Sequence, residues 1–130
     1  MVCAQDAPSL YPARSSRVDL TFSAEDEAFR REIAGWLTEQ LDGEFRSVRG
    51  RGGPGDEHAL FEERLAWERR LGEAGWTCVA WPQEHGGRGL SFTRQGIFYG
   101  EYARAGGTGR VGHIGETPLR PPLVAFGTDA

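Results

Sequence analysis

The residue types most able to do chemistry gather in one stretch, GWTCVAWPQEHGGRGLS, over residues 75–91. It combines His85 and Arg88 with a glycine-rich turn, as do many phosphate-binding loops and catalytic turns. A dinucleotide-binding loop, however, follows a strand, has the spacing G-x-G-x-x-G and needs an acidic residue about 20 positions further on. Here a helix is expected before the turn, and GGRGL has the wrong spacing. We therefore interpret the stretch as a joint between helices, anchored by Trp76 and Trp81, with Arg88 bound to a carboxylate or unpaired.

The other reactive side chains are dispersed along the chain. His58, His85 and His113 lie far apart and lack the H-x-x-x-H or C-x-x-C spacing of metal ligands. No serine lies in a G-x-S-x-G elbow, and Glu101 and Glu116 have no partner carboxylate nearby in the sequence. The residues themselves therefore predict no catalytic group and no metal site.

The composition bounds the partners of the chain. Its 130 residues carry 15 cations, all of them arginine, and 19 acids, so the formal net charge is −4. Dispersed arginines in an acidic chain are not typical of nucleic-acid binding, and no basic stripe indicates binding to a membrane surface. No window has the ~20 apolar residues of a membrane span, and the N-terminus lacks a secretory signal. We expect a cytoplasmic protein whose Cys3 and Cys78 are reduced thiols.

The first predicted element is an amphipathic helix that begins after Ser23, a good N-cap residue, and ends at residues 42–43. A glycine-rich segment over residues 43–56 follows and is predicted to be a mobile loop whose arginines are solvated. The apolar face of the helix repeats at spacings of three and four and consists of Phe29, Ile33, Trp36, Leu37 and Leu41.

Two further amphipathic helices are predicted after that loop. One covers about residues 57–74, with Asp56 as its cap and Gly75 as its stop, and the other covers about residues 92–104 with Ser91 as its cap. The expected apolar faces are Leu60, Phe61, Leu65, Trp67, Leu71 and Ala74 in the former, and Phe92, Phe98, Tyr99, Tyr102 and Ala103 in the latter.

The last predicted helix is broken by Pro118, Pro121 and Pro122, because proline in a helix interior costs about 3 kcal/mol. A regular helix is expected only after Pro122 or in the first turn after Pro118. No stretch alternates as a strand would. The sequence thus predicts an all-α fold, a small helical bundle of three good amphipathic helices plus a proline-broken fourth, in a domain over residues 18–130 after a disordered tail over residues 1–17.

Four strings in order carry a family resemblance: VDLTFSAEDEAFRREIAGWL, WERRLGEAGWTCVAWPQEHGGRGLS, QGIFYGEYARAG and GHIGETPLRPPLVAFGT. Together they resemble the N-terminal helical domain of the FAD-dependent acyl-CoA dehydrogenases, of the actinobacterial type that includes enzymes of steroid side-chain degradation. The resemblance covers residues 18–128. The order of Gly-Trp, Trp-Pro, Gly-Gly-Arg-Gly and Phe-Gly-Thr is specific, although each piece alone is common. By this resemblance the chain is an incomplete domain, truncated before the β and C-terminal domains.

The resemblance implies a role in lipid metabolism, in the FAD-dependent α,β-dehydrogenation of an acyl-CoA thioester. In these flavoproteins FAD lies between the β domain, the C-terminal domain and a neighbouring subunit, and the glutamate base lies in the C-terminal helical part. The chain alone is therefore expected to hold no FAD and to supply no catalytic residue. It would act only with a complementary dehydrogenase chain.

The same resemblance assigns one wall of the acyl pocket to the string RVGHIGE. It implies substrate-lining roles for Arg110, Val111, Gly112, His113 and Glu116. Relatives usually carry an apolar residue at Pro118, a small one at Arg120 and glutamate at Gly100, so this chain departs from the family pattern. Two alternatives stay open: a non-enzymatic helical module that pairs with a dehydrogenase subunit or self-associates, and a remnant of a split or frameshifted gene without function.

Overall fold

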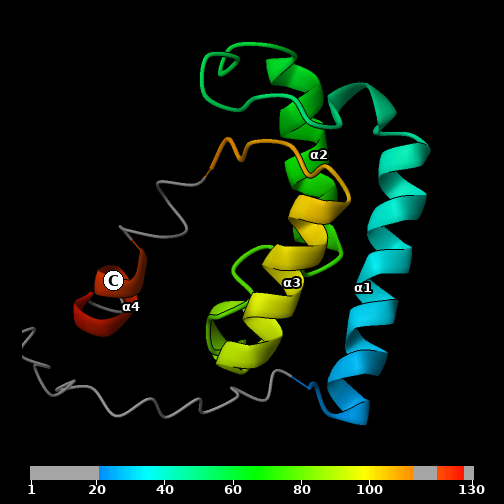
Figure 1. Ribbon diagram of the computed structural model, residues 1–130. Helices are drawn as coiled ribbons and strands as arrows, with labels where there is room; N and C mark the ends of the chain where they lie inside the picture. The colour runs from blue at the N-terminus through cyan, green and yellow to red at the C-terminus, as the bar shows by residue number, and fades with distance from the viewer. Residues whose placement is uncertain (1–20, 113–119, 128–130) are drawn as a thin grey trace, which may run out of the picture.

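The computed structural model describes residues 21–112 and 120–127 of the chain. Its helices are α1 (Ala24–Asp42), α2 (Phe61–Glu73), α3 (Phe92–Arg104) and α4 (Arg120–Phe126), with short 3-10 turns η1 (Arg46–Val48) and η2 (Gln83–His85) in the connections. Figure 1 shows α1 and α3 side by side, with α4 apart from the bundle. The described residues contain no strand, so the predicted all-α bundle is confirmed.

Helix α1 begins and packs as its sequence predicts. The Ser23 hydroxyl accepts a hydrogen bond from the backbone N–H of Asp26 at 3.1 Å, which satisfies one of the free N–H groups of the first turn. Its apolar side chains face the core, where Phe29, Ile33, Leu37 and Leu41 are buried, and Trp36 is partly buried against them.

The core centres on Trp67 of α2, which is fully buried. Its ring lies 5.8 Å from the ring of Trp36 and 5.1 Å from that of Phe45, measured between centroids. Phe45 and Val48 flank and end η1, and both are buried. The glycine-rich segment after α1 therefore supplies two core residues. Its interpretation as a solvated mobile loop was wrong, because Phe45 and Val48 are buried against the core.

Helix α2 begins later than predicted. Asp56 does not cap it, because the carboxylate of Asp56 accepts hydrogen bonds from the side chain of Arg51 and the backbone N–H of Gly52 instead. The helix starts after Leu60, which has a left-handed φ of 49°. The predicted apolar face is also wrong at Phe61, which is 47% exposed, because Arg64 and not Phe61 points into the structure from the first turn of the helix.

The joint over residues 75–91 closes α2. Gly75 has a φ of 72°, its N–H donates to Gly72 O, and the N–H of Trp76 donates to Leu71 O at 2.7 Å. This is a Schellman motif, with Trp76 and Leu71 as its apolar pair. Arg88 donates to the carbonyl oxygens of Ala74 and Gly75, at 2.8 Å each. The expectation of a carboxylate partner or none was wrong, because the free carbonyls of a helix end attract a cation.

Two glycine-to-alanine changes of opposite sign test this account of the helices. Gly75→Ala places a side chain at a left-handed φ and is expected to lower the free energy of unfolding by about 1–2 kcal/mol. Gly35→Ala, in the middle of α1 with no atom near its added Cβ, is expected to raise it by about 0.5–1 kcal/mol. Urea unfolding of both variants measures the difference, and the same sign for both would contradict the assignment.

Helix α3 has the predicted bounds and cap, but its predicted apolar face is only partly buried: Phe98 and Tyr102 pack in or against the core as expected. Ile97, Phe98 and Glu101 face the core, whereas Phe92 is 91% and Tyr99 is 56% exposed. Charged pairs set this rotation. Arg94 Nε donates to Asp26 Oδ1 of α1 at 2.9 Å, and Glu101 pairs with Arg30 of α1 and with Arg104.

Helix α4 begins at Arg120, two residues after Pro118 in the sequence, and therefore at the earlier of the two predicted positions and not after Pro122. Pro121 and Pro122 lie in its first turn, where backbone N–H groups have no partner within the helix, so proline costs little there. The N–H of Gly127 donates to Leu123 O at 2.7 Å at the other end. Pro118 lies outside the described residues.

Candidate functional site

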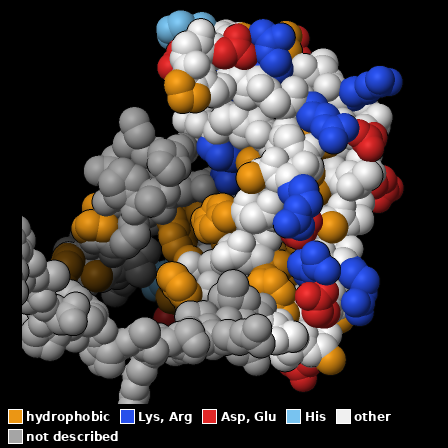
Figure 2. Space-filling model, viewed as in Figure 1, with side chains coloured by type: hydrophobic (Ala, Val, Ile, Leu, Met, Phe, Trp, Pro, Cys, Tyr) orange, Lys and Arg blue, Asp and Glu red, His pale blue; other side chains and the backbone are white. Residues whose placement is uncertain are grey.

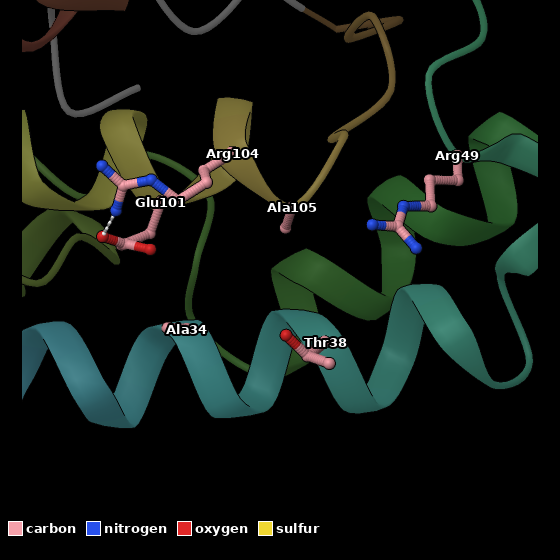
Figure 3. Close-up of a pocket in the computed structure, with 6 residues that line it drawn as sticks. All are labelled: Ala34, Thr38, Arg49, Glu101, Arg104 and Ala105. Carbon is pink, nitrogen blue, oxygen red and sulfur yellow. Dashed lines mark hydrogen bonds and ion pairs between the residues drawn. The ribbon is translucent and has the colours of Figure 1, made fainter.

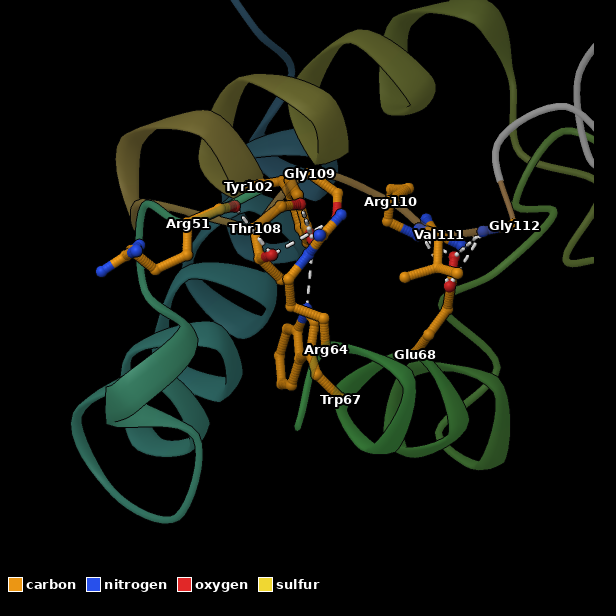
Figure 4. Close-up of polar contacts among 10 residues, drawn as sticks. All are labelled: Arg51, Arg64, Trp67, Glu68, Tyr102, Thr108, Gly109, Arg110, Val111 and Gly112. Carbon is orange, nitrogen blue, oxygen red and sulfur yellow. Dashed lines mark hydrogen bonds and ion pairs between the residues drawn. The ribbon is translucent and has the colours of Figure 1, made fainter. Parts of the chain in front are cut away.

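The described part of the predicted acyl-pocket wall, residues 110–112, lies against α2 and is held by one carboxylate. Glu68 accepts hydrogen bonds from Arg110 Nε at 2.8 Å, from the N–H of Val111 at 3.0 Å and from the N–H of Gly112 at 2.9 Å. Figure 4 shows these donors converging on the Glu68 side chain. The structure thus brings Arg110, Val111 and Gly112 together, whereas His113 and Glu116 lie outside the described residues.

A buried arginine holds the chain one turn earlier on α2. The Arg64 side chain donates through Nη2 to Gly109 O at 2.8 Å and through Nη1 to Glu57 O at 2.6 Å, and the residue is only 4% exposed. Gly52 must be glycine here, since a Cβ would lie 2.2 Å from Arg64 Cζ. Arg64 and Glu68 were not among the predicted site residues, although charges at these positions flank Trp67 on the buried face and signal an internal polar contact.

Two hydroxyl groups complete the attachment. Thr108 is 2% exposed, and its hydroxyl donates to Arg51 O at 2.9 Å. The Tyr102 hydroxyl donates to Thr108 O at 2.8 Å and accepts a hydrogen bond from Trp67 Nε1 at 3.0 Å. We call residues 108–112 the strap. Arg64 of α2 donates to the carbonyl oxygen of Gly109 in the strap, and Glu68 of α2 accepts hydrogen bonds from the N–H groups of residues 111–112 (Figure 4). The charged side chains of α2 thus match the backbone polar groups of the strap.

The strap borders a cleft with a volume of about 460 Å³. Arg110 and Val111 line it from the strap, and Phe61 of α2 presents its partly exposed ring from the other side. The complete lining is Gly52, Glu57, His58, Phe61, Arg64, Arg110 and Val111. The lining thus combines the apolar side chains of Phe61 and Val111 with the cations Arg64 and Arg110 and the carboxylate of Glu57.

A second, smaller cleft of about 220 Å³ lies between α1 and α3 and is lined by Ala34, Thr38, Arg49, Glu101, Arg104 and Ala105 (Figure 3). Its charged groups bind one another or neighbouring side chains. Glu101 pairs with Arg104, and Arg49 pairs with Asp42. Glu101, an isolated carboxylate in the sequence, is therefore 7% exposed with its charge compensated, which indicates a structural role.

The remaining candidates for chemistry stay apart in space. His85 Nε2 lies 3.9 Å from Glu84 on the surface. Over residues 21–112 and 120–127, no three His, Cys, Asp or Glu side chains come together as metal ligands would. In the joint, a Cβ on Gly87 would lie 2.2 Å from Trp81 O. This glycine makes room for the protein's own backbone, which is a structural reason for glycine at this position of the turn.

One carboxyl group beside the cleft predicts a pH dependence. The Arg51 guanidinium, with the N–H of Gly52, lowers the pKa of Asp56 from 3.8 to about 2. A carboxyl whose pKa is lowered by folding stabilises the fold above its unfolded pKa, and this contribution disappears as the pH falls through the folded pKa. We therefore expect the stability difference between wild type and Asp56→Asn to be constant above pH ~4 and to shrink between pH ~4 and ~2.

Thermal melts across that pH range measure the effect, with Glu62→Gln as a control at an exposed carboxylate of α2. A stability difference that does not change with pH would contradict the role of the Arg51–Asp56 pair.

Comparison with known proteins identifies the family. The model of the acyl-CoA dehydrogenase N-terminal domain matches residues 23–130. The chain belongs to the acyl-CoA dehydrogenase family. It is 56% identical over 102 residues to acyl-CoA dehydrogenase IpdE1 of Mycobacterium tuberculosis, covering 78% of this chain and 26% of that protein. It is 51% identical over 104 residues to IpdE1 of Mycolicibacterium smegmatis, covering 80% and 26% respectively.

The helical arrangement of this acyl-CoA dehydrogenase chain also matches a solved structure. The ChsE4-ChsE5 complex of Mycobacterium tuberculosis aligns with a TM-score of 0.66 and 27% identity, covering 86% of this chain and 26% of that chain. The chain thus spans about a quarter of the length of the relatives that it matches. No helix in the described ranges is both long and apolar enough to cross a membrane.

Proposed function

We propose that this chain is the N-terminal segment of an acyl-CoA dehydrogenase and that it works only together with the remainder of the dehydrogenase fold. Acyl-CoA dehydrogenases are generally FAD-dependent, and the chain spans about a quarter of its relatives. That remainder, produced as a separate complementary chain in the experiments below, holds FAD, which takes the hydride when bound, and supplies the base. This chain supplies one wall of the acyl pocket, and the observation that carries the proposal is the strap, which α2 fixes next to an apolar cleft.

The surface for this assembly is the outer face of α3. Phe92 and Tyr99 are exposed there, and a Cβ added at Gly96 or Gly100 would meet no atom within 4 Å. The charges of Arg94 and Glu101 point to α1 instead. Figure 2 shows hydrophobic side chains gathered over and beside α3. A helix exposed to water in the functional state normally carries polar residues on its outer face, so this uncharged face supports a protein partner.

We infer that the partner of this face is an apolar helical surface on the rest of the dehydrogenase. About three quarters of each relative's length has no counterpart in this chain. The solved relative is itself a complex of two named components, ChsE4 and ChsE5. The remaining portion of the dehydrogenase fold is therefore the natural cover for α3.

Co-expression tests the proposed assembly. This chain, carrying an affinity tag, is produced together with the remaining three quarters of the 56%-identical relative. We expect the two to co-purify as a complex. Phe92→Glu is expected to abolish co-purification, because it places a charge on the proposed apolar interface.

Ala28→Glu provides the matched control, since Ala28 is an exposed apolar residue of α1. Recovery of the tagged chain alone, or equal recovery of the complex with Phe92→Glu and with wild type, would contradict the proposal. A tagged chain that pairs only with its own copies would favour the self-association alternative instead.

A further inference from the structure

We propose that Glu68 is a positioning residue for the acyl-pocket wall. Its carboxylate fixes the backbone of residues 110–112, the described part of that wall. The inference rests on the proposed function and adds to it a residue of α2 that lies outside the wall itself.

The carboxylate of Glu68 meets its donors in a geometry that only a charged acceptor satisfies fully. Arg110 Nε and the N–H of Gly112 both lie within 3.0 Å of Oε1, and the N–H groups of Val111 and Gly112 lie within 3.0 Å of Oε2. The side chains of Glu68 and Arg110 are only 12% and 14% exposed, so water competes little. Hydrogen bonds to an ionised acceptor are about twice as strong as neutral ones.

A glutamine at position 68 would break this match. Its side chain has one acceptor oxygen, and its NH₂ group would face N–H donors. It would also remove the carboxylate charge that Arg110 meets at 2.8 Å beside the cleft. The approach is close as well, because a Cβ on Gly112 would lie 3.3 Å from Glu68 Oε1.

The effect of Glu68 is local, since other groups hold the earlier part of the strap. Arg64 binds the carbonyl of Gly109, and the Thr108 hydroxyl binds Arg51 O. Neither contact involves Glu68. Loss of the Glu68 carboxylate is therefore expected to release residues 110–112 and to leave residues 108–109 and the core of the bundle in place.

Steady-state kinetics of the co-expressed complex test the inference, with acyl-CoA substrates of increasing acyl length. Glu68→Gln is expected to raise the KM on the order of tenfold, with kcat within about twofold, because a displaced wall weakens ground-state and transition-state binding equally. The preference among acyl lengths is expected to flatten. Glu63→Gln, at an exposed position of the same helix, is expected to change neither quantity.

Amide hydrogen exchange in the same complex gives a second readout. Glu68→Gln is expected to speed exchange at Val111 and Gly112 and to leave Gly109 unchanged. Gly112→Val keeps α2 intact, crowds the same carboxylate, and is expected to raise the KM in the same direction if Glu68→Gln fails to fold. Unchanged KM with faster exchange overturns the positioning role, and unchanged exchange overturns the attachment itself. An unmutated complex that assembles but is inactive overturns the proposed function, and this inference with it.

Discussion

Trp67→Ala is expected to abolish the cooperative unfolding transition of the chain. Trp67 is fully buried between the rings of Trp36 and Phe45, and its Nε1 donates to the Tyr102 hydroxyl. Replacing a buried tryptophan by alanine costs about 3–5 kcal/mol, because apolar burial is lost and a cavity remains. A small domain has a free energy of unfolding of about 5–15 kcal/mol. For a domain near the lower end of that range, this single change would remove most of the stability.

Urea unfolding followed by tryptophan fluorescence and far-UV circular dichroism measures the effect of Trp67→Ala. Phe92→Ala is the control, since it also deletes an aromatic ring but at a position that is 91% exposed. Its effect on the isolated chain is expected to stay within about 0.5 kcal/mol. Equal midpoints for the two variants would show that Trp67 does not centre the core.

Arg64→Ala is expected to destabilise the chain by about 3 kcal/mol. The substitution leaves the carbonyl oxygens of Gly109 and Glu57 without the donor that now reaches them inside the structure. A buried carbonyl oxygen without a donor destabilises the fold by the free energy of removing it from water, because no hydrogen bond compensates for the loss. Arg64→Lys is not expected to rescue stability, because a single ammonium cannot reproduce the forked donors of a guanidinium.

Arg69→Ala is the matched control for Arg64, because it removes an exposed arginine from the same helix. We expect a change within about 0.5 kcal/mol there. If Arg64→Ala and Arg69→Ala unfold at the same urea concentration, the buried arginine is not what holds the strap to α2.

Local signals allowed much of the helical framework to be predicted. Ser23 and Ser91 cap α1 and α3 as their sequence contexts indicate, because capping involves atoms only three residues apart. The stop of α2 at Gly75 follows from the left-handed conformation that glycine adopts without strain. The family resemblance, carried by the same joint, is confirmed by the match over residues 23–130.

The rotation of α3 was not predictable from its own apolar residues. Hydrophobicity alone puts Phe92 and Tyr99 inside, but the ion pairs of Arg94 and Glu101 with α1 turn that face outward. An apolar face that serves an interface with another chain has the same sequence pattern as one that serves the core. Periodicity therefore locates the faces of a helix without saying which one its own domain covers.

The attachment of the strap was missed for a related reason. Arg64 binds a carbonyl 45 residues away, and Glu68 binds N–H groups 43 and 44 residues away. Backbone partners have no sequence signature, so neither charge reveals its target. The sequence does show that both charges lie next to Trp67 in α2, on the side of the helix that its apolar residues share and away from its charged surface. The substrate-lining role of residues 110–113 and 116 and the boundary of the domain at residue 18 stay predictions.

The most direct measurement of the central claim is an anaerobic titration of the co-expressed complex with acyl-CoA while the visible absorbance of flavin is followed. The account predicts that the complex holds flavin that acyl-CoA bleaches. It also predicts that this chain alone holds none, and that the complementary chain alone is not bleached. Stoichiometric flavin on this chain by itself, or equal bleaching of the complementary chain in its absence, would contradict the claim that the two chains complete one dehydrogenase.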